Sequence, residues 1–295
     1  MNIKNGIIMK KNISIFAMAL VASAFTSCMT AQESIVPSKN YVTKKVKVGK
    51  FDGISTATSI DVLYTQTSND QDIEIYAPDN LMEYVKVDEE NGMLKIRFKG
   101  KDSKTGININ GKHKTEVRIS APAVHKLRAS SSGDIILKNG LQTKGEVSMK
   151  SSSSGDIEGG NVVCDVLNAE SSSSGDVSIK ELKAETVNAA ASSSGDVSIK
   201  YLKAESVNAE ASSSGDVILS GVCRSANFSA SSSGDVEAKN LQADAVNANA
   251  SSAGDITCHA VESLNVTTST SGNVNYKGNP KHIDYHPKKG LKKID

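Results

Sequence analysis

The stretch "GDVSIKYLKAESVNAEASSS", Gly195 to Ser214, decides how this chain folds. Its apolar residues alternate with polar ones in three short runs, which contain Val197 and Ile199, then Leu202 and Ala204, then Val207, Ala209 and Ala211. A period of two is typical of a β-strand with one buried face, whereas a helix would place apolar residues at i, i+3, i+4 and i+7. The stretch therefore predicts three short strands separated by bends.

The same stretch recurs along the chain, and one glycine in a serine-rich corner marks its period. These corner glycines are Gly133, Gly155, Gly175, Gly195, Gly215, Gly234, Gly254 and Gly272. The steps between them are 22, 20, 20, 20, 19, 20 and 18 residues. A constant period near this length indicates one structural unit stacked on the next. The sequence therefore predicts an all-β fold, a single-stranded right-handed parallel β-helix (solenoid) with about 20 residues and three short strands per coil.

Stacking places equivalent residues of successive coils above one another, roughly 4.8 Å apart. Seven residues before each of six successive corner glycines stands an asparagine, and these are Asn168, Asn188, Asn208, Asn227, Asn247 and Asn265. Stacked side-chain amides can hydrogen-bond along the axis of such a stack. We interpret this row as a structural asparagine ladder.

The corner "SSSGD" ends in an aspartate in seven coils. These residues are Asp134, Asp156, Asp176, Asp196, Asp216, Asp235 and Asp255, and Asn273 ends the series. Glycine allows a positive φ or a close backbone approach, and an aspartate can cap the backbone N–H groups of a bend. The serine hydroxyls can fill a narrow corner and bond along the stack. The motif is therefore predicted to build one edge of a prism.

A cation-binding edge is the alternative interpretation of these aspartates. Neighbouring stacked carboxylates repel by on the order of 1–3 kcal/mol, and a bound Ca²⁺ would offset that repulsion. The denser Gly and Asp pattern of the calcium-binding nonapeptide repeat is not present. The seven aspartates are the metal-ligand candidates of this chain, no catalytic residue is identified, and no cofactor other than this Ca²⁺ is expected.

Three cysteines lie within the repeats. Cys164 and Cys223 align with Ala184 and Ala204, and Cys258 aligns with inward isoleucines. The first two lie three coils apart, about 14 Å by the strand spacing. A disulfide requires Cα atoms within about 7 Å of one another. All three are therefore predicted to be small buried residues with unreactive thiols.

The first residues, 1–28, are predicted to be a signal peptide. Lys10 and Lys11 precede the apolar segment Ile13–Phe25, which ends in "FTSC". This ending resembles a bacterial lipobox and predicts lipidation of Cys28; ordinary cleavage near Ala31 is the alternative. Residues 29–41 are expected to form a flexible linker. The protein is expected to be exported as an outer membrane lipoprotein, on the cell surface or the periplasmic face, without a transmembrane helix.

The two ends of the repeat are less regular. Residues 42–128 are predicted to form less regular β coils and a cap, with Asp61 in the corner aspartate position and a loop at 105–113. Residues 129–276 are predicted to form the regular β-helix of SSSGD repeats, and residues 277–295 a basic C-terminal cap or tail. His282, Asp284 and His286 are weak metal-ligand candidates, because no second cluster accompanies them.

The pattern "FDGISTATSIDVLYTQ…IEIYAPDNLMEYVKV…GMLKIRF", followed by serial "SSSGD(I/V)" coils, resembles the putative auto-transporter adhesin, head GIN domain family. The resemblance covers roughly residues 48–277. It implies a right-handed β-helix, export and an envelope role. It implies no catalytic residues, and fold alone does not determine function.

Three functions remain open. The net charge is +1, and the sequence has neither an arginine-rich patch nor interleaved aromatic residues on which bases could stack. These features argue against a nucleic-acid partner. The favoured function is a non-enzymatic adhesin-like or scaffold solenoid that binds a glycan or protein, with homo-oligomerisation left open. A cation- or ligand-binding ladder is the second. A polysaccharide-active enzyme is the third, disfavoured because coils of 18 to 22 residues leave no loops for a cleft wall.

Overall fold

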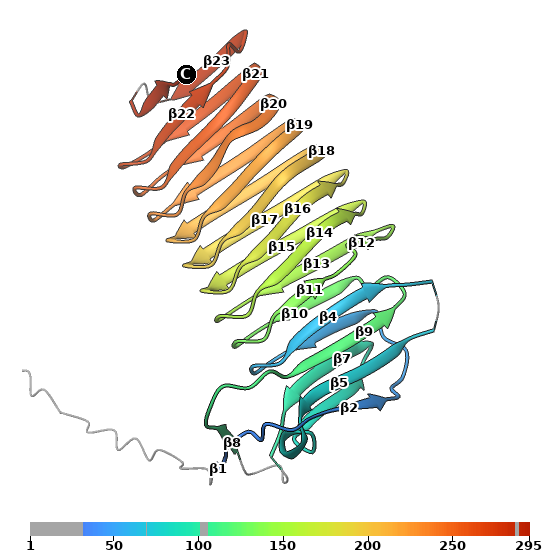
Figure 1. Cartoon of the computed structure of the whole chain (residues 1–295). Coiled ribbons are helices and arrows are strands. Elements are labelled where there is room, and N and C mark those ends of the chain that lie inside the picture. Colours follow the sequence, from blue (N-terminus) through green and yellow to red (C-terminus); the bar gives the residue numbers. More distant parts are fainter. Residues whose placement is uncertain (1–31, 69, 101–105, 287–288) are drawn as a thin grey trace, which may run out of the picture.

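The computed structural model describes residues 32–68, 70–100, 106–286 and 289–295, so the predicted signal peptide and Cys28 lie outside the described residues. Figure 1 shows an elongated stack of β coils, with the N-terminal strands at one end and β23 (His282–His286) at the other. The described residues contain one short 3₁₀ helix, η1 (Asp79–Leu81), and otherwise strands and connections. The all-β prediction is confirmed.

The regular part of the stack pairs each strand with its equivalent in the next coil. Its strands are β10 (Lys126–Ala129), β11 (Ile135–Leu137), β12 (Leu141–Gln142), β13 (Glu146–Ser151), β14 (Ile157–Val163), β15 (Val166–Ser173), β16 (Val177–Lys183), β17 (Thr186–Ser193), β18 (Val197–Ser213), β19 (Val217–Ser231), β20 (Val236–Ala250) and β21 (Asp255–Thr268). All pairings between these strands are parallel, as in Val187 with Val207. The stack has about 8 coils offset by about 20 residues, which confirms the predicted β-solenoid.

The interior of the stack is a continuous column of small apolar side chains. In one coil the buried residues are Val177, Ile179, Leu182, Ala184, Val187, Ala189 and Ala191. All of these except Ala184 pair with an apolar residue of the coil before or after them. The alternation of buried and exposed residues restarts twice per coil, so the coil has three inward-facing runs, as the sequence predicts.

The number of strands per coil differs from the prediction. One coil contains two strands, β16 and β17, and the next contains a single long strand, β18. Two consecutive exposed residues, Lys200 and Tyr201, mark a bend inside β18. β16 pairs in parallel with β18 both before this bend, at Ile199, and after it, at Leu202. The alternation therefore identifies the faces of the prism rather than separate strands.

The N-terminal end combines coils with antiparallel strands. Its strands are β2 (Tyr41–Val46), β3 (Gly53–Thr56), β4 (Asp61–Gln66), β5 (Asp72–Pro78), β6 (Val85–Glu90), β7 (Met93–Phe98) and β9 (Glu116–Ala121). β3 and β4 pair in parallel with β10 and β11, and they form the coil that Asp61 predicts. β2–β5, β5–β9 and β6–β7 are antiparallel, and these pairings were not expected. Because of these antiparallel strands, the end of the stack does not present the same edge as a regular parallel coil. This difference limits the pairing of two molecules end to end.

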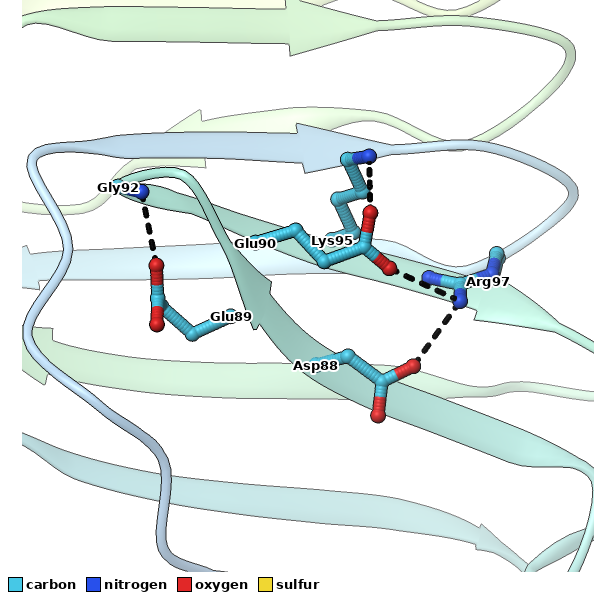
Figure 2. A network of polar contacts seen from close by, with 6 residues as sticks. All are labelled: Asp88, Glu89, Glu90, Gly92, Lys95 and Arg97. Atoms are coloured by element: carbon cyan, nitrogen blue, oxygen red, sulfur yellow. Dashed lines mark hydrogen bonds and ion pairs between the residues drawn. The ribbon is translucent and has the colours of Figure 1, made fainter.

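The hairpin between β6 and β7 is closed by a tight turn. Asn91 and Gly92 both have positive φ, 54° and 78°, as in two-residue hairpin turns. Figure 2 shows the polar network beside this turn, formed by Asp88, Glu89, Glu90, Gly92, Lys95 and Arg97. The Gly92 N–H donates to Glu89 Oε1 at 2.7 Å, and Lys95 Nζ lies 2.5 Å from Glu90 Oε2. Such exposed ion pairs stabilise a fold by at most about 1 kcal/mol each.

The segment expected to be a flexible linker is ordered over its described part. β1 (Gln32–Ile35) pairs in parallel with β8 (Gly106–Ile109), within the region predicted to be a loop. Asp79 accepts hydrogen bonds from Ser38 Oγ at 2.5 Å and from Asn40 Nδ2 at 2.8 Å. Both predictions are wrong for the described residues, because each segment supplies the partner of the other.

The C-terminal residues add a partial coil. β22 (Asn273–Lys277) pairs with β21, and β24 (Leu291–Lys293) pairs with β22. β23 pairs in parallel with β21. Within the described residues this basic segment is therefore a cap rather than a free tail, and its lysines protect the last edge. No helix in the described ranges is long and apolar enough to cross a bilayer.

Candidate functional site

In the "SSSGD" corners a serine, and not the glycine, adopts the left-handed backbone conformation. Ser173, Ser193 and Ser213 have φ values of 63°, 62° and 63°, whereas none of the corner glycines has a positive φ. A left-handed residue other than glycine costs about 1–2 kcal/mol. Hydrogen bonds between corners offset that cost, because the N–H groups of Ser194 and Ser214 each donate to the preceding corner at 2.7 Å. Of the two roles predicted for the glycine, a positive φ or a close backbone approach, the corner does not use the first.

The corner glycines are required by close packing between coils. A Cβ added at Gly215 would lie 2.6 Å from Ser192 N and 2.7 Å from Gly195 O. A Cβ added at Gly175 would lie 2.6 Å from Gly155 O. Real Cβ atoms do not approach backbone atoms this closely. The second predicted role of the glycine, close backbone approach, is confirmed.

The corner aspartates form a continuous ladder from coil to coil. Each aspartate accepts a hydrogen bond at Oδ1 from the backbone N–H of the equivalent residue in the next coil, at 2.8 to 3.4 Å. The ladder runs from Asp61 through Asp134, Asp156, Asp176, Asp196, Asp216, Asp235 and Asp255 to Asn273. The aspartates therefore cap the backbone N–H of the following coil.

The environment of several aspartates in this ladder disfavours negative charge. Burial raises the pKa of Asp134, Asp176 and Asp216, and the charge of neighbouring aspartates adds to the effect. The donated N–H groups act in the opposite direction. Among the described residues no group of three or more His, Cys, Asp or Glu could hold a metal ion. Capping accounts for the row, and Ca²⁺ binding by the aspartates stays a prediction.

Replacing Asp216 separates capping from charge. Asp216→Asn keeps the Oδ1 acceptor for the Asp235 N–H, 3.0 Å away, and removes a charge. A carboxyl with a raised folded-state pKa weakens stability above that pKa, and the fold gains stability as pH falls through it. Asp216→Asn should therefore match or exceed the wild-type stability at neutral pH and lose this advantage near about pH 4.

Asp216→Ala is the matched variant, since it removes the acceptor as well. It should destabilise the fold by about 1–3 kcal/mol in urea unfolding. Equal losses in Asp216→Asn and Asp216→Ala would show that the negative charge itself is required, as for a bound cation.

The asparagine row is a hydrogen-bonded ladder on the outside of one face. Each Nδ2 donates to Oδ1 of the asparagine one coil earlier at 2.7 to 2.9 Å, and the first, Asn168, donates to Glu146 Oε1 at 2.6 Å. The predicted ladder is confirmed. Its amide dipoles all point the same way, and their positive end meets the Glu146 carboxylate. Each inner amide still has one N–H and one oxygen lone pair that the ladder does not use.

A shallow groove of about 630 Å³ lies beside this ladder, and we call it the Asn groove. One row of its lining is the asparagine ladder, and the second row is Glu170, Ala190, Glu210, Ser229, Asn249 and Thr267. Ala189, Ala209, Phe228 and Ala248 lie between the two rows and form the floor. Ala190 leaves space because it is small and lies between Glu170 and Glu210.

A second hollow of about 800 Å³ follows a different edge and contains two of the cysteines. Cys164 and Cys223 are 5% and 7% exposed, and Cys258 is fully buried. All three are free, and burial raises the pKa of their thiols to about 11 for Cys164 and to about 12 for the other two. The predicted burial of the three thiols is confirmed, and their low reactivity stays a prediction.

The three cysteines should be alkylated slowly in the folded protein. A thiol protonated at neutral pH and shielded from solvent is a poor nucleophile. Peptide mapping after brief iodoacetamide treatment should show modification at each site at least about tenfold slower than in denaturant. Rapid native labelling of Cys223 would show that this edge opens.

The histidine cluster is not assembled as a metal site. His286 Nε2 lies 3.1 Å from Asp284 Oδ1, and both side chains are more than two-thirds exposed. No third ligand joins them among the described residues. The sequence identified the Asn ladder but missed the groove beside it. The second lining row has no common residue type, so only the strand register reveals it.

Residues 50–180 and 169–280 each match the family model described as "Putative auto-transporter adhesin, head GIN domain". The fold is similar to crystal structures of putative adhesins from Parabacteroides merdae (20% identity, TM-score 0.65) and Parabacteroides distasonis (20%, 0.66). It is also similar to a putative lipid binding protein from P. distasonis (22%, 0.63). Each comparison covers 89% of this chain and 100% of the other. No curated protein matches the sequence.

Proposed function

Since the chain belongs to the putative auto-transporter adhesin, head GIN domain family, we propose that it is a non-enzymatic, adhesin-like protein of the bacterial envelope. The observation that carries this proposal is the Asn groove, which crosses successive coils without interruption. A rigid, repeating surface of this kind suits an extended partner. The proposed role is binding, with the solenoid as the scaffold.

The uniformity of the coils supports a role without catalysis. β-helical enzymes place carboxylates and basic residues together in a cleft that long inserted loops wall off. The hollow of about 800 Å³ also brings carboxylates together with Lys and Arg side chains, but the coils that line it keep an offset of 19 or 20 residues, so no inserted loop walls it off. The regular corner aspartates are instead engaged with backbone N–H groups. The aspartates therefore recur because each coil needs an acceptor for the backbone N–H of the next coil.

A lipid anchor at Cys28 completes the proposed placement. The "FTSC" ending supports acylation of Cys28 and attachment to the outer membrane, facing the surface or the periplasm. Cells fed an alkyne-tagged fatty acid should label the wild-type protein and not the Cys28→Ala variant. Label that persists in Cys28→Ala would overturn this assignment.

Adhesion of whole cells tests the function itself. Cells that lack the protein, cells with the wild-type chain and cells with Cys28→Ala are compared on surfaces coated with purified polysaccharides or matrix proteins. The wild-type cells should be retained most strongly. Equal retention of all three on every surface would contradict a binding role at the cell surface.

A further inference from the structure

We propose that the Asn groove binds a neutral, extended polysaccharide whose chain lies along the solenoid axis. This inference rests on the proposed function and names the ligand class of its binding surface. It follows from the hydrogen-bonding capacity of the groove, its period, its charge and its lack of aromatic anchors.

The ladder amides keep hydrogen-bonding groups that the ladder does not use, and these groups recur in each coil. Each ladder amide uses one N–H and one lone pair for its neighbours in the stack, as in the 2.8 Å bond from Asn208 to Asn188. An amide has two N–H groups and two lone pairs, so each inner rung retains one donor and one acceptor. Sugar hydroxyls are also both donors and acceptors, and they can pair with either group.

The groove repeats on the scale of a sugar ring. Its rungs follow the coil spacing of roughly 4.8 Å, so the row from Asn168 to Asn265 extends over about 24 Å. In an extended polysaccharide, hydroxyl groups recur with each ring at a comparable interval. A chain laid along the axis can therefore present equivalent hydroxyls to successive rungs.

The charge of the lining selects against acidic polymers. Glu170 and Glu210 are the ionisable groups of the lining, and both are negative. Lys150 lies 2.6 Å from Glu170, so it offsets the charge at one end. Beyond Glu210 the second row continues with Ser229, Asn249 and Thr267, which are uncharged. A neutral chain avoids the repulsion that a uronic acid or sulfated polymer would meet.

A protein partner fits this groove less well than a glycan. Protein interfaces depend on tryptophan, tyrosine and arginine anchors in desolvated pockets. The lining contains one aromatic residue, Phe228, and its side chain is only 3% exposed. The groove therefore offers many weak polar contacts rather than a few strong anchors.

Ala190→Arg is the decisive variant because it obstructs the groove at one coil without removing a rung. Position 190 lies between Glu170 and Glu210 in adjacent coils, so the new guanidinium meets carboxylates on both sides. Ser178→Arg is the matched control. It lies between Glu158 and Ser198 on another face of the same region, outside the groove lining.

The measurement is affinity electrophoresis of the mature protein in gels that contain one soluble polysaccharide each. The probes are a mixed-linkage β-glucan, a mannan and a dextran as neutral chains, with polygalacturonate as the acidic control. At least one neutral probe should retard the wild-type protein and Ser178→Arg equally. Ala190→Arg should bind that probe at least about tenfold more weakly, with an unchanged melting temperature.

The results separate this inference from the proposed function. If no neutral probe binds, or if polygalacturonate alone binds, the inference is overturned. Equal binding by Ala190→Arg and the wild type would also overturn it. If Ala190→Arg cells lose adhesion while no neutral probe binds, the groove holds a protein instead, and the adhesin-like function stands. If cells without the protein adhere normally, the proposed function fails regardless of the gels.

Discussion

Gly215→Ala should destabilise the protein by about 3 kcal/mol, although it adds one methyl group. The new Cβ would lie 2.6 Å from Ser192 N and 2.7 Å from Gly195 O, which are backbone atoms of the previous coil. Backbone atoms cannot rotate away as a flexible side chain can, so relief requires the two coils to separate. Separation would weaken the hydrogen bond between the Asp216 N–H and Asp196 Oδ1.

Gly160→Ala is the matched control for this experiment. Gly160 lies in β14, has no positive φ, and has no atom within 4 Å of an added Cβ. Its replacement should leave stability unchanged or raise it by about 0.4–1 kcal/mol, because alanine restricts the unfolded chain. Urea unfolding of both variants measures the difference. A Gly215→Ala midpoint within error of the wild type would show that the corner can expand at little cost.

Phe228→Ala should destabilise the protein by about 3–5 kcal/mol. Phe228 is 3% exposed and stands in a position that holds alanine in the coils on both sides, Ala209 and Ala248. Its ring fills space that small neighbours leave, so truncation creates a cavity bordered by alanines that cannot reach into it. The loss therefore includes both the transfer free energy of the ring and the cavity.

The unfolding profile of Phe228→Ala should also change in form. In a solenoid each coil contacts mainly its neighbours, so a weakened coil divides the stack into partly independent segments. We expect a second transition, or a reduced urea dependence, in circular dichroism. Val222→Ala is the control, since Val222 is 48% exposed and its truncation should change stability by less than about 0.5 kcal/mol. A loss below about 1 kcal/mol for Phe228→Ala would mean that the interior column collapses to fill the space.

Gly215→Ala and Phe228→Ala both test whether the proposed binding surface depends on the packing of successive coils. The Asn groove exists only while successive coils keep their register, because its rows come from different coils. Phe228 forms part of its floor. Loss of packing at that position is therefore expected to disturb the ladder bond between Asn227 and Asn208 as well.

Much of the fold follows from the sequence, because the repeat imposes the same local choices in each coil. The period of the corner glycines predicted the parallel coils, and the alternation around Val187 predicted the buried face. The ladder that contains Asn188 followed from position alone. Asp196 was predicted to cap the N–H groups of its own bend, and in the structure it accepts from the Asp216 N–H of the next coil instead. The three buried cysteines followed from alignment with small inward residues.

Other features depend on which segments meet in space. The antiparallel strands β2, β5 and β6 and the pairing of β1 with β8 join residues without a shared pattern. Only the structure shows that Ser193 rather than Gly195 has the positive φ, and that the previous coil leaves no space for a Cβ at Gly195.

By itself the sequence determined the coil length, the inward face and the asparagine ladder, since each depends on a residue type that recurs at a constant interval. Only the tertiary structure decided how the stack is capped and where a groove lies beside the asparagines. Capping depends on pairing between unlike strands. The groove depends on the strand register, which places the asparagine row beside a second row of unlike residues and sets Ala190 between Glu170 and Glu210.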